Sequence, residues 1–249
     1  IYECSLRSCI FIDCNATLGG SIYVSISQPN RHYATIEGCT FTTNEATESG
    51  GAIYATVRDS LTVKKCSFNN NKAVNGSSIW CQIGQNNGKD SDDTALLYGN
   101  TFTFTPTEGN KINVYVQSRK FDNENISANA NIIFGKNTFA AINPSVQDYQ
   151  LLEIKELGTF QSIQFIECNC IQGAESTVKI ASASKPITTN LIFNCQSLDQ
   201  CPSEGEKPPV NDKCQSYPDR QDSIGQEVSL KKACFTNIKA PISTEGGAI

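Results

Sequence analysis

The residue types that could do chemistry in this chain are its 12 cysteines, its single histidine and one small group of acidic side chains. Any Ser–His–acid or Cys–His site would have to use His32, which lies in a polar turn sequence, where a surface histidine is the ordinary outcome. Asp90, Asp92 and Asp93 lie in a stretch rich in Gly, Asn and Ser, without the spacing or the closing Glu of an EF-hand. Adjacent acids in an extended segment point apart, so a solvated loop is favoured over the carboxylate pair of a glycosidase. We therefore predict no catalytic residue, no metal site and no cofactor.

The cysteines do not have the spacing of a zinc site, because no pair of C-x-x-C knuckles occurs. An oxidising compartment with some disulfides is more natural, which predicts a secreted or cell-surface protein. Cys201 and Cys214 flank a Pro-rich stretch and form a candidate disulfide. Cys9, Cys39 and Cys66 occupy one equivalent position of a repeat, where we favour a stack of small buried thiols over the alternative of disulfides.

The charge pattern excludes two classes of partner. The formal net charge is −5 and the charged residues are scattered, which argues against binding to nucleic acid or to an anionic membrane surface. No apolar run approaches the roughly 18 residues of a membrane-spanning helix. Three N-x-[ST] sequons, at Asn15, Asn75 and Asn125, are glycosylation candidates.

A two-part repeat dominates the sequence. Its first half is centred on Phe11, Phe41 and Phe68, which lie 30 and 27 residues apart. The three clear copies are 9–16 with 19–23, 39–46 with 50–54, and 66–73 with 76–80. Weaker copies surround Phe102, Phe139, Phe165 and Phe193, and the chain ends on the near-consensus pieces 234–237 and 246–249.

The repeat predicts a solenoid of short strands. Apolar and polar residues alternate over stretches such as 61–68, and a period of two residues indicates strands with one inward face. One copy has too little apolar surface to fold alone, whereas stacked copies bury a shared column. Glycine pairs favour sharp corners, and an Asn after each Phe can bond to the equivalent Asn one coil away.

We therefore predict an all-β protein, a single parallel β-helix (β-solenoid) of about 7–8 coils over residues 1–249. Loop insertions are expected near 84–95, 118–128 and 201–224, the last with several prolines. The domain could be a segment of a longer repeat array. An open β-helix end exposes unpaired backbone groups, so we expect either further sequence beyond Ile249 or end-to-end assembly.

Three aromatic residues stand at one repeat position, after the Gly-rich corner. If alternation holds, Tyr23, Tyr54 and Trp80 face outward and could contact a glycan or a protein partner; a shielded stack between coils is the alternative. The Thr-rich stretch 101–105 resembles a flat ice-binding face, but such threonines do not recur at the same coil position, so strand preference is expected to explain them.

The repeat resembles that of the chlamydial polymorphic outer membrane proteins. That family is marked by F-x-x-N and G-G-A-I tetrapeptides, which match Phe41 to Asn44 with Gly50 to Ile53, while Gly246 to Ile249 match the second motif. The resemblance implies a right-handed β-helix and a surface adhesin role. Similar repeats also occur in large surface proteins of some protists.

The function predicted from these features is structural or adhesive and not enzymatic. The partners would be a cell-surface protein, a glycan or copies of the chain itself. The alternative is a carbohydrate-active β-helix enzyme, such as a polysaccharide lyase or hydrolase, with an unfamiliar site, because many β-helices host such activities.

Overall fold

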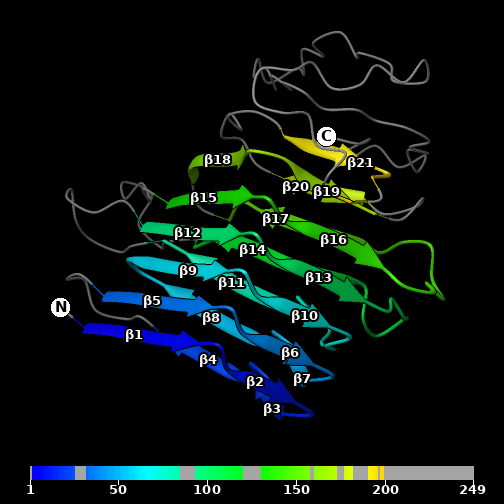
Figure 1. The fold of residues 1–249 in the computed structure, drawn as a ribbon, viewed down its shortest axis with the longest axis horizontal. Coiled ribbons are helices and arrows are strands. Elements are labelled where there is room, and N and C mark those ends of the chain that lie inside the picture. The colour runs from blue at the N-terminus through cyan, green and yellow to red at the C-terminus, as the bar shows by residue number, and fades with distance from the viewer. Residues whose placement is uncertain are drawn as a thin grey trace, which may run out of the picture.

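The computed structural model describes residues 2–25, 32–84, 93–119, 130–157, 160–172, 177–181, 190–195 and 197–198. Within these residues the regular elements are all strands. Each strand pairs in parallel with the equivalent strand of the next coil, so the chain winds around one axis from β1 at one end to β21 near the other (Figure 1). The predicted parallel β-helix is confirmed.

Three long sheets form the faces of the solenoid. The first sheet contains, in stacking order, β1 (Tyr2–Arg7), β5 (His32–Glu37), β9 (Ser60–Lys64), β12 (Asp93–Tyr98), β15 (Ala130–Gly135) and β18 (Phe160–Ile166). The second sheet contains β2 (Ile10–Ile12), β6 (Thr40–Thr42), β10 (Ser67–Asn69), β13 (Thr101–Phe104), β16 (Thr138–Ala141), β19 (Asn169–Ile171) and β21 (Leu191–Phe193). The third sheet contains β4 (Ile22–Ser25), β8 (Ile53–Val57), β11 (Ile79–Ile83), β14 (Ile112–Ser118), β17 (Gln150–Lys155) and β20 (Thr177–Ala181), and a short sheet pairs β3 (Asn15–Leu18) with β7 (Glu45–Ser49).

The core is a set of columns, each contributed by one register position. The Phe rings of the second sheet stack from Phe11 to Phe139, with centroids 4.8 to 5.0 Å apart between neighbouring coils. Period-two alternation places these rings inside and their neighbours outside, as in β8 and β11, where alternate residues are buried. Because every coil buries its apolar face against the next, the columns form one continuous core.

Glycine is required at the corner before the third sheet. Gly19, Gly50 and Gly76 have φ of 62°, 70° and 63°, in the left-handed region. A Cβ at Gly50 would lie 2.4 Å from the carbonyl oxygen of Ile53, and the other two positions are as tight. The paired glycines of the repeat therefore reflect a backbone that side chains would obstruct.

The structure changes three details of the predicted organisation. Strand β12 begins at Asp93 and β14 extends to Ser118, so the bounds 84–95 and 118–128 given for the first two expected insertions each overlap a strand. Phe165 pairs with Phe134 in the first sheet and is not part of the Phe column, where Ile171 takes the position after Phe139. The insertion expected at 201–224 and the chain end lie outside the described residues.

Candidate functional site

The predicted aromatics form a row on the third sheet. Tyr23, Tyr54 and Trp80 occupy one register position on β4, β8 and β11, and Tyr115 on β14 continues the row. Neighbouring rings are stacked, with centroids 5.2, 4.3 and 6.4 Å apart and interplanar angles of 5°, 4° and 12°. We call these four residues the aromatic row. The preceding isoleucines Ile53 and Ile79 are buried, so the row lies on the outer side of its strands.

The stacking determines which atoms of the aromatic row a ligand could reach. The flat faces of Tyr54 and Trp80 are covered by neighbouring rings, so these residues offer ring edges and polar atoms. Among the described residues β4 is the last strand of this sheet, and Tyr23 stacks on the ring of Tyr54 alone. Tyr23 is 57% exposed as a residue, so its ring can offer a flat apolar platform.

Burial raises the pKa of two phenols of the aromatic row. Burial raises the pKa of Tyr54, and the nearby Tyr23 and Glu48 add to the shift. The pKa of Tyr115 is raised by burial and by the charge of Glu153. Both hydroxyls are therefore hydrogen-bond donors at neutral pH and above.

A second row of uncharged polar side chains runs beside the aromatic row. It consists of Ser25, Thr56, Gln82 and Gln117, which share the register position two residues further along each strand. The Thr56 hydroxyl lies 3.4 Å from that of Ser25, and the Tyr115 hydroxyl donates to Gln117 Oε1 at 3.2 Å. We call these four residues the polar row. Together the two rows present apolar ring edges and hydrogen-bonding groups at each coil, about 4.8 Å apart along the axis.

The composition of the aromatic row changes toward the later coils. The register position of Tyr115 is taken by Glu153 on β17 and by Lys179 on β20, which form an ion pair of 3.4 Å. Tyr115 is only 9% exposed, in contrast to Tyr23. Tyr115 was missed in the sequence because its strand lacks the Gly-Gly signal, and its spacing from Trp80 departs from the earlier period.

The threonines of the second sheet recur at equivalent positions, and the expectation that they do not was wrong. Thr40, Ser67, Thr101 and Thr138 share one outer register position, and Thr42, Asn69 and Thr103 share another. The sequence obscured this because the intervals between coils vary. The side chains at these two register positions form two short polar rows on the outer face of the second sheet, opposite the Phe column.

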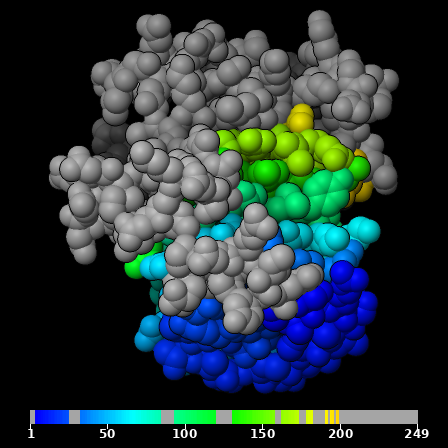
Figure 2. Space-filling view, turned by 90° about the vertical axis from the view of Figure 1, so that its left-hand side faces the viewer, coloured from blue at the N-terminus to red at the C-terminus, as the bar shows by residue number. Residues whose placement is uncertain are grey.

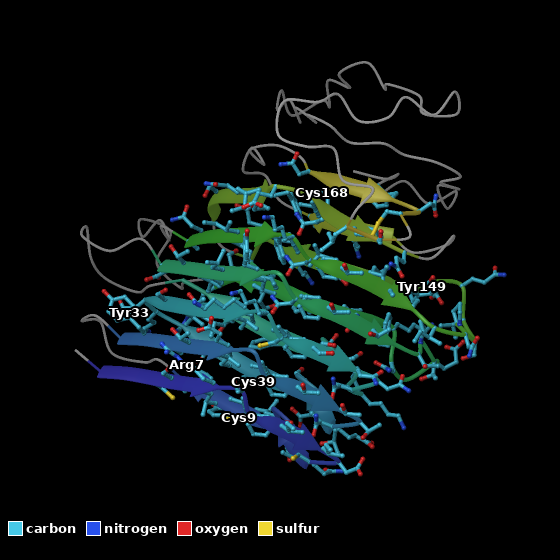
Figure 3. The ribbon with its side chains drawn as sticks, viewed as in Figure 1. Arg7, Cys9, Tyr33, Cys39, Tyr149 and Cys168 are labelled. Atoms are coloured by element: carbon cyan, nitrogen blue, oxygen red, sulfur yellow. A yellow bond between two sulfur atoms is a disulfide. The ribbon has the colours of Figure 1, made fainter. Side chains whose placement is uncertain are left out.

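The repeat cysteines lie at the corner between the first and second sheets. Cys9, Cys39 and Cys66 are free thiols, with Cys39 and Cys66 buried, and Figure 3 shows Cys9 and Cys39 on successive coils. The Cys9 amide donates to Cys39 Sγ at 3.4 Å, and the Cys39 thiol lies 3.7 Å from the carbonyl oxygen of Leu6. The Cys66 thiol makes the same contact, 3.5 Å from the carbonyl oxygen of Ile36. The thiols are thus hydrogen-bonded parts of the corner.

Asparagine takes the same corner position in the later coils. The Cys66 amide donates to Asn100 Oδ1 at 2.9 Å, and Asn100 and Asn137 donate in turn to the next Asn. The Nδ2 groups of Asn100 and Asn137 donate to the carbonyl oxygens of Val63 and Leu97, at 2.9 and 2.8 Å. We call this column, which runs Cys9, Cys39, Cys66, Asn100, Asn137 and Asn169, the corner ladder.

A second ladder at the next corner confirms the role expected for the Asn after each Phe. Asn44 Nδ2 donates to Asn71 Oδ1 at 2.8 Å and to the carbonyl oxygen of Phe11 at 3.2 Å. The Cys14 amide donates to Asn44 Oδ1 at 3.0 Å, so a cysteine again starts the column. These amides belong to the fold rather than to a site.

One disulfide is present among the described residues. It is the bond for which both cysteines are described, and it joins Cys170 to Cys195, with Cα atoms 5.7 Å apart. Cys168 is also disulfide-bonded. The two cysteines on either side of Asn169 do not bond to each other. The predicted pair Cys201 and Cys214 lies outside the described residues.

Two of the residues considered for catalysis lie in described strands. His32 begins β5 rather than occupying a turn, and Asp93 begins β12, where it is buried rather than solvated in a loop. Asp90 and Asp92 lie outside the described residues. Within the described part of the chain, no group of three or more His, Cys, Asp or Glu side chains is arranged to hold a metal ion.

The sequons differ in environment. Asn15 is exposed on β3, and Thr17, the third residue of its sequon, is exposed too. Asn75 is half-buried and bridges to Ser49, while Ser77 of its sequon is buried and donates to the carbonyl oxygen of Ile112 at 2.8 Å. Asn125 lies outside the described residues.

Comparison with known proteins gives one result for a short part of the chain. No helix in the described residues is long and apolar enough to cross a membrane. No curated protein and no solved structure shows significant similarity to the chain. Residues 38–56, which span β6, β7 and most of β8, match the Chlamydia polymorphic membrane protein repeat, and the chain therefore carries a repeat of this type.

Proposed function

We propose that the chain is an extracellular or cell-surface β-helix that works by contact with a surface protein, with a glycan or with copies of itself. The observation that carries the proposal is the aromatic row with the polar row beside it, on one outer face of a stacked scaffold. Ligand contact at such a face needs no moving part, because successive coils hold the side chains in register. The polymorphic membrane protein repeat supports a location at the cell surface.

The ring geometry makes the proposed contact specific. A sugar ring stacks on an exposed aromatic face, and Tyr23 is the member of the row whose stacking leaves such a face. The hydroxyls of Tyr54 and of the polar row would then hydrogen-bond along an extended ligand that follows the axis. An uncharged or weakly charged ligand fits, because the four polar-row side chains carry no charge.

The test is a glycan and cell-surface binding screen of the purified chain. We compare the wild type with a Tyr23→Ala, Tyr54→Ala and Trp80→Ala triple variant, and with a matched triple variant of the second sheet, Thr40→Ala, Ser67→Ala and Thr101→Ala. Saturable binding that is lost only in the first variant is expected. Equal loss in both variants contradicts contact at the aromatic row, and a wild type that binds no glycan and no cell surface contradicts contact with either of them.

Two single variants separate the modes of contact. Tyr23→Ala removes the free ring face and one stacking pair, whereas Tyr54→Phe removes one hydroxyl and leaves the stack intact. Contact through a ring face predicts loss in Tyr23→Ala and little change in Tyr54→Phe. Contact through the polar edge predicts the reverse. Circular dichroism of each variant checks that the β-helix persists.

We also propose that Asn15 is a glycan attachment site and that Asn75 is not, because the first sequon is exposed and the second is built into a corner. Production in a eukaryotic secretory host, followed by enzymatic deglycosylation and mass spectrometry, tests this. A glycan on Asn75, or none on Asn15, contradicts it.

A further inference from the structure

The outer face of the third sheet changes in charge along the axis of the solenoid. On β4, β8, β11 and β14 it carries the aromatic row and the polar row, whose side chains are all uncharged. On β17 the same two register positions hold Glu153 and Lys155, and on β20 they hold Lys179 and Ala181. Figure 2 shows the coils in order along the axis, from blue through cyan to green and yellow, so the uncharged and charged parts of this face follow one another along the rod.

Lys155 supplies a positive charge that no side chain of this face balances. Lys179 forms its ion pair with Glu153 at 3.4 Å, and the Glu153 side chain is only 10% exposed. Lys155 is exposed, and within the described part of the chain its ammonium group has no ion-pair partner. Its charge is therefore available to a ligand that lies on the outer face.

Gln117 provides a second donor beside Lys155. The two residues share one register position on the neighbouring strands β14 and β17, which lie about 4.8 Å apart. The Oε1 atom of Gln117 accepts from the Tyr115 hydroxyl at 3.2 Å, which leaves the N–H groups of Nε2 for another acceptor. Two adjacent donors, one of them charged, form a site that suits an anionic group.

The charge of this position is opposite to that of the whole chain. The formal net charge of the chain is −5. On β17 and β20 the two outward register positions hold two lysines and one glutamate, which leaves one positive charge. Because charge complementarity orients a ligand on a surface, an anionic group is expected at this end of the two rows and a neutral part along them.

We propose that the third sheet binds an acidic glycan, with neutral sugars along the aromatic row and the polar row and an anionic sugar substituent, carboxylate or sulfate, held by Lys155 and Gln117. The anion fixes the direction of the glycan, since the charged donor lies at the β17 end of the rows only. This inference rests on the glycan part of the proposed function and names the class of glycan.

The test is isothermal titration of the purified chain with three oligosaccharides. One is a neutral chain of N-acetyllactosamine units, the second is the same chain ending in one sialic acid, and the third is the same chain carrying one terminal sulfate. Each is titrated into the wild type and into Lys155→Gln, which removes the charge and places at this register position the residue type that Gln82 and Gln117 already show to fit.

Two further variants serve as controls. Lys155→Arg keeps the positive charge at the same position. Lys72→Gln removes the charge of another exposed lysine, which has no ion-pair partner among the described residues and whose backbone bridges to Glu45, away from the third sheet.

The two acidic oligosaccharides should bind the wild type at least about tenfold more tightly than the neutral one, because a charge-assisted hydrogen bond is stronger than a neutral one. Lys155→Gln should abolish this difference and leave the affinity for the neutral oligosaccharide unchanged. Lys155→Arg and Lys72→Gln should keep the difference. Tight binding of only one acidic oligosaccharide also supports the proposal and identifies the anion as a carboxylate or a sulfate.

Equal affinity of the wild type for the acidic and neutral oligosaccharides overturns this inference alone and leaves the proposed function standing. A loss in Lys72→Gln as large as that in Lys155→Gln overturns it too, because the effect would then not belong to this position. A wild type that binds none of the three overturns it together with the glycan part of the proposed function. Saturable binding of an oligoglutamate peptide in place of the glycans would assign the site to an acidic protein and would also overturn it.

Discussion

The corner ladder is built from sulfur in the first coils and from amides in the later ones. The thiols of Cys39 and Cys66 each donate to a carbonyl oxygen of the preceding coil, with Sγ···O distances of 3.5 to 3.7 Å. The Nδ2 groups of Asn100 and Asn137 donate to the equivalent carbonyl oxygens at 2.8 to 2.9 Å. Backbone amides donate to the next side chain in both halves. Two different side chains thus fill one structural position.

The difference lies in the number of protons each side chain can share. A thiol has one weak donor, which at Cys66 is divided between the carbonyl oxygens of Ile36 and Lys64. An Asn has two N–H groups, so Asn100 and Asn137 donate both to a carbonyl and to the Asn of the next coil, at 3.1 and 3.0 Å. Each coil with an Asn in the corner ladder therefore makes one more hydrogen bond to the next coil than a coil with a Cys. The coils with Cys in the corner ladder (the thiol half) should therefore unfold before those with Asn (the amide half).

The largest loss of stability is expected from removing an asparagine of the corner ladder. Asn137→Ala removes the acceptor of the Asn100 amide and of the Asn100 Nδ2 group, and the donor to the Leu97 carbonyl, all inside the core. Each buried polar group left without a partner costs about 1–3 kcal/mol, so the free energy of unfolding should fall by about 3 kcal/mol or more. Urea unfolding measures this, with Thr138→Ala as the control on the adjacent outer position. A loss no larger than that of the control contradicts the ladder.

A smaller loss of stability is expected from removing a cysteine of the corner ladder. Cys66→Ala deletes a small buried side chain and one weak hydrogen bond, which should cost about 1–2 kcal/mol. Cys66→Asn should cost less than Cys66→Ala, because the position receives the same carbonyl and amide partners as Asn100. Urea unfolding of the three proteins side by side decides the matter. Greater instability of the Asn variant would show that thiol and amide are not interchangeable here.

The buried thiols should also respond to alkaline pH. Burial raises the pKa of Cys66 and of Cys81 to about 12, above the ordinary thiol value of 9.0. The native state then binds more protons than the unfolded state between these values, so stability is retained below about pH 9 and is lost as pH rises toward 12. Thermal unfolding at pH 8 and pH 11 should show the fall, and Cys66→Ala with Cys81→Ala should reduce it. An unchanged fall in that variant would place its cause elsewhere.

The smallest perturbation is chemical labelling of the native protein. Cys4 is exposed and Cys9 and Cys14 are half-buried, whereas Cys39, Cys66 and Cys81 are buried. Alkylation followed by mass spectrometry should modify the first group at least about tenfold faster, since buried neutral thiols react only when the coils open. Within the buried group, Cys39 should react before Cys81 if opening starts at the N-terminal end. Uniform rates would contradict an ordered opening.

The strongest sequence signals were those that repeat at nearly constant spacing. Phe11, Phe41 and Phe68 predicted the core column, and the Asn after each of the last two predicted a ladder between coils. Phe165 was assigned to the wrong sheet, because the interval between coils lengthens and a Phe in another strand carries the same alternation. The recurring threonines were missed for the same reason.

The candidate site shows the same division. Tyr23, Tyr54 and Trp80 could be aligned because each follows a Gly-rich corner, and the structure stacks them as one row. Tyr115 joins the row without that signal, and its polar neighbours come from strands whose register only pairing fixes. Nothing in the spacing of the sequence indicated that the ring faces would be covered by one another.

The sequence by itself determined the period, the inward Phe and the glycine corners, because each depends on local alternation or on a backbone conformation that one residue type favours. Only the tertiary structure decided which residues of different coils share a position. Register depends on the lengths of the insertions and on hydrogen bonds between coils, as in the change from Cys66 to Asn100, where two unlike side chains hold equivalent carbonyl groups.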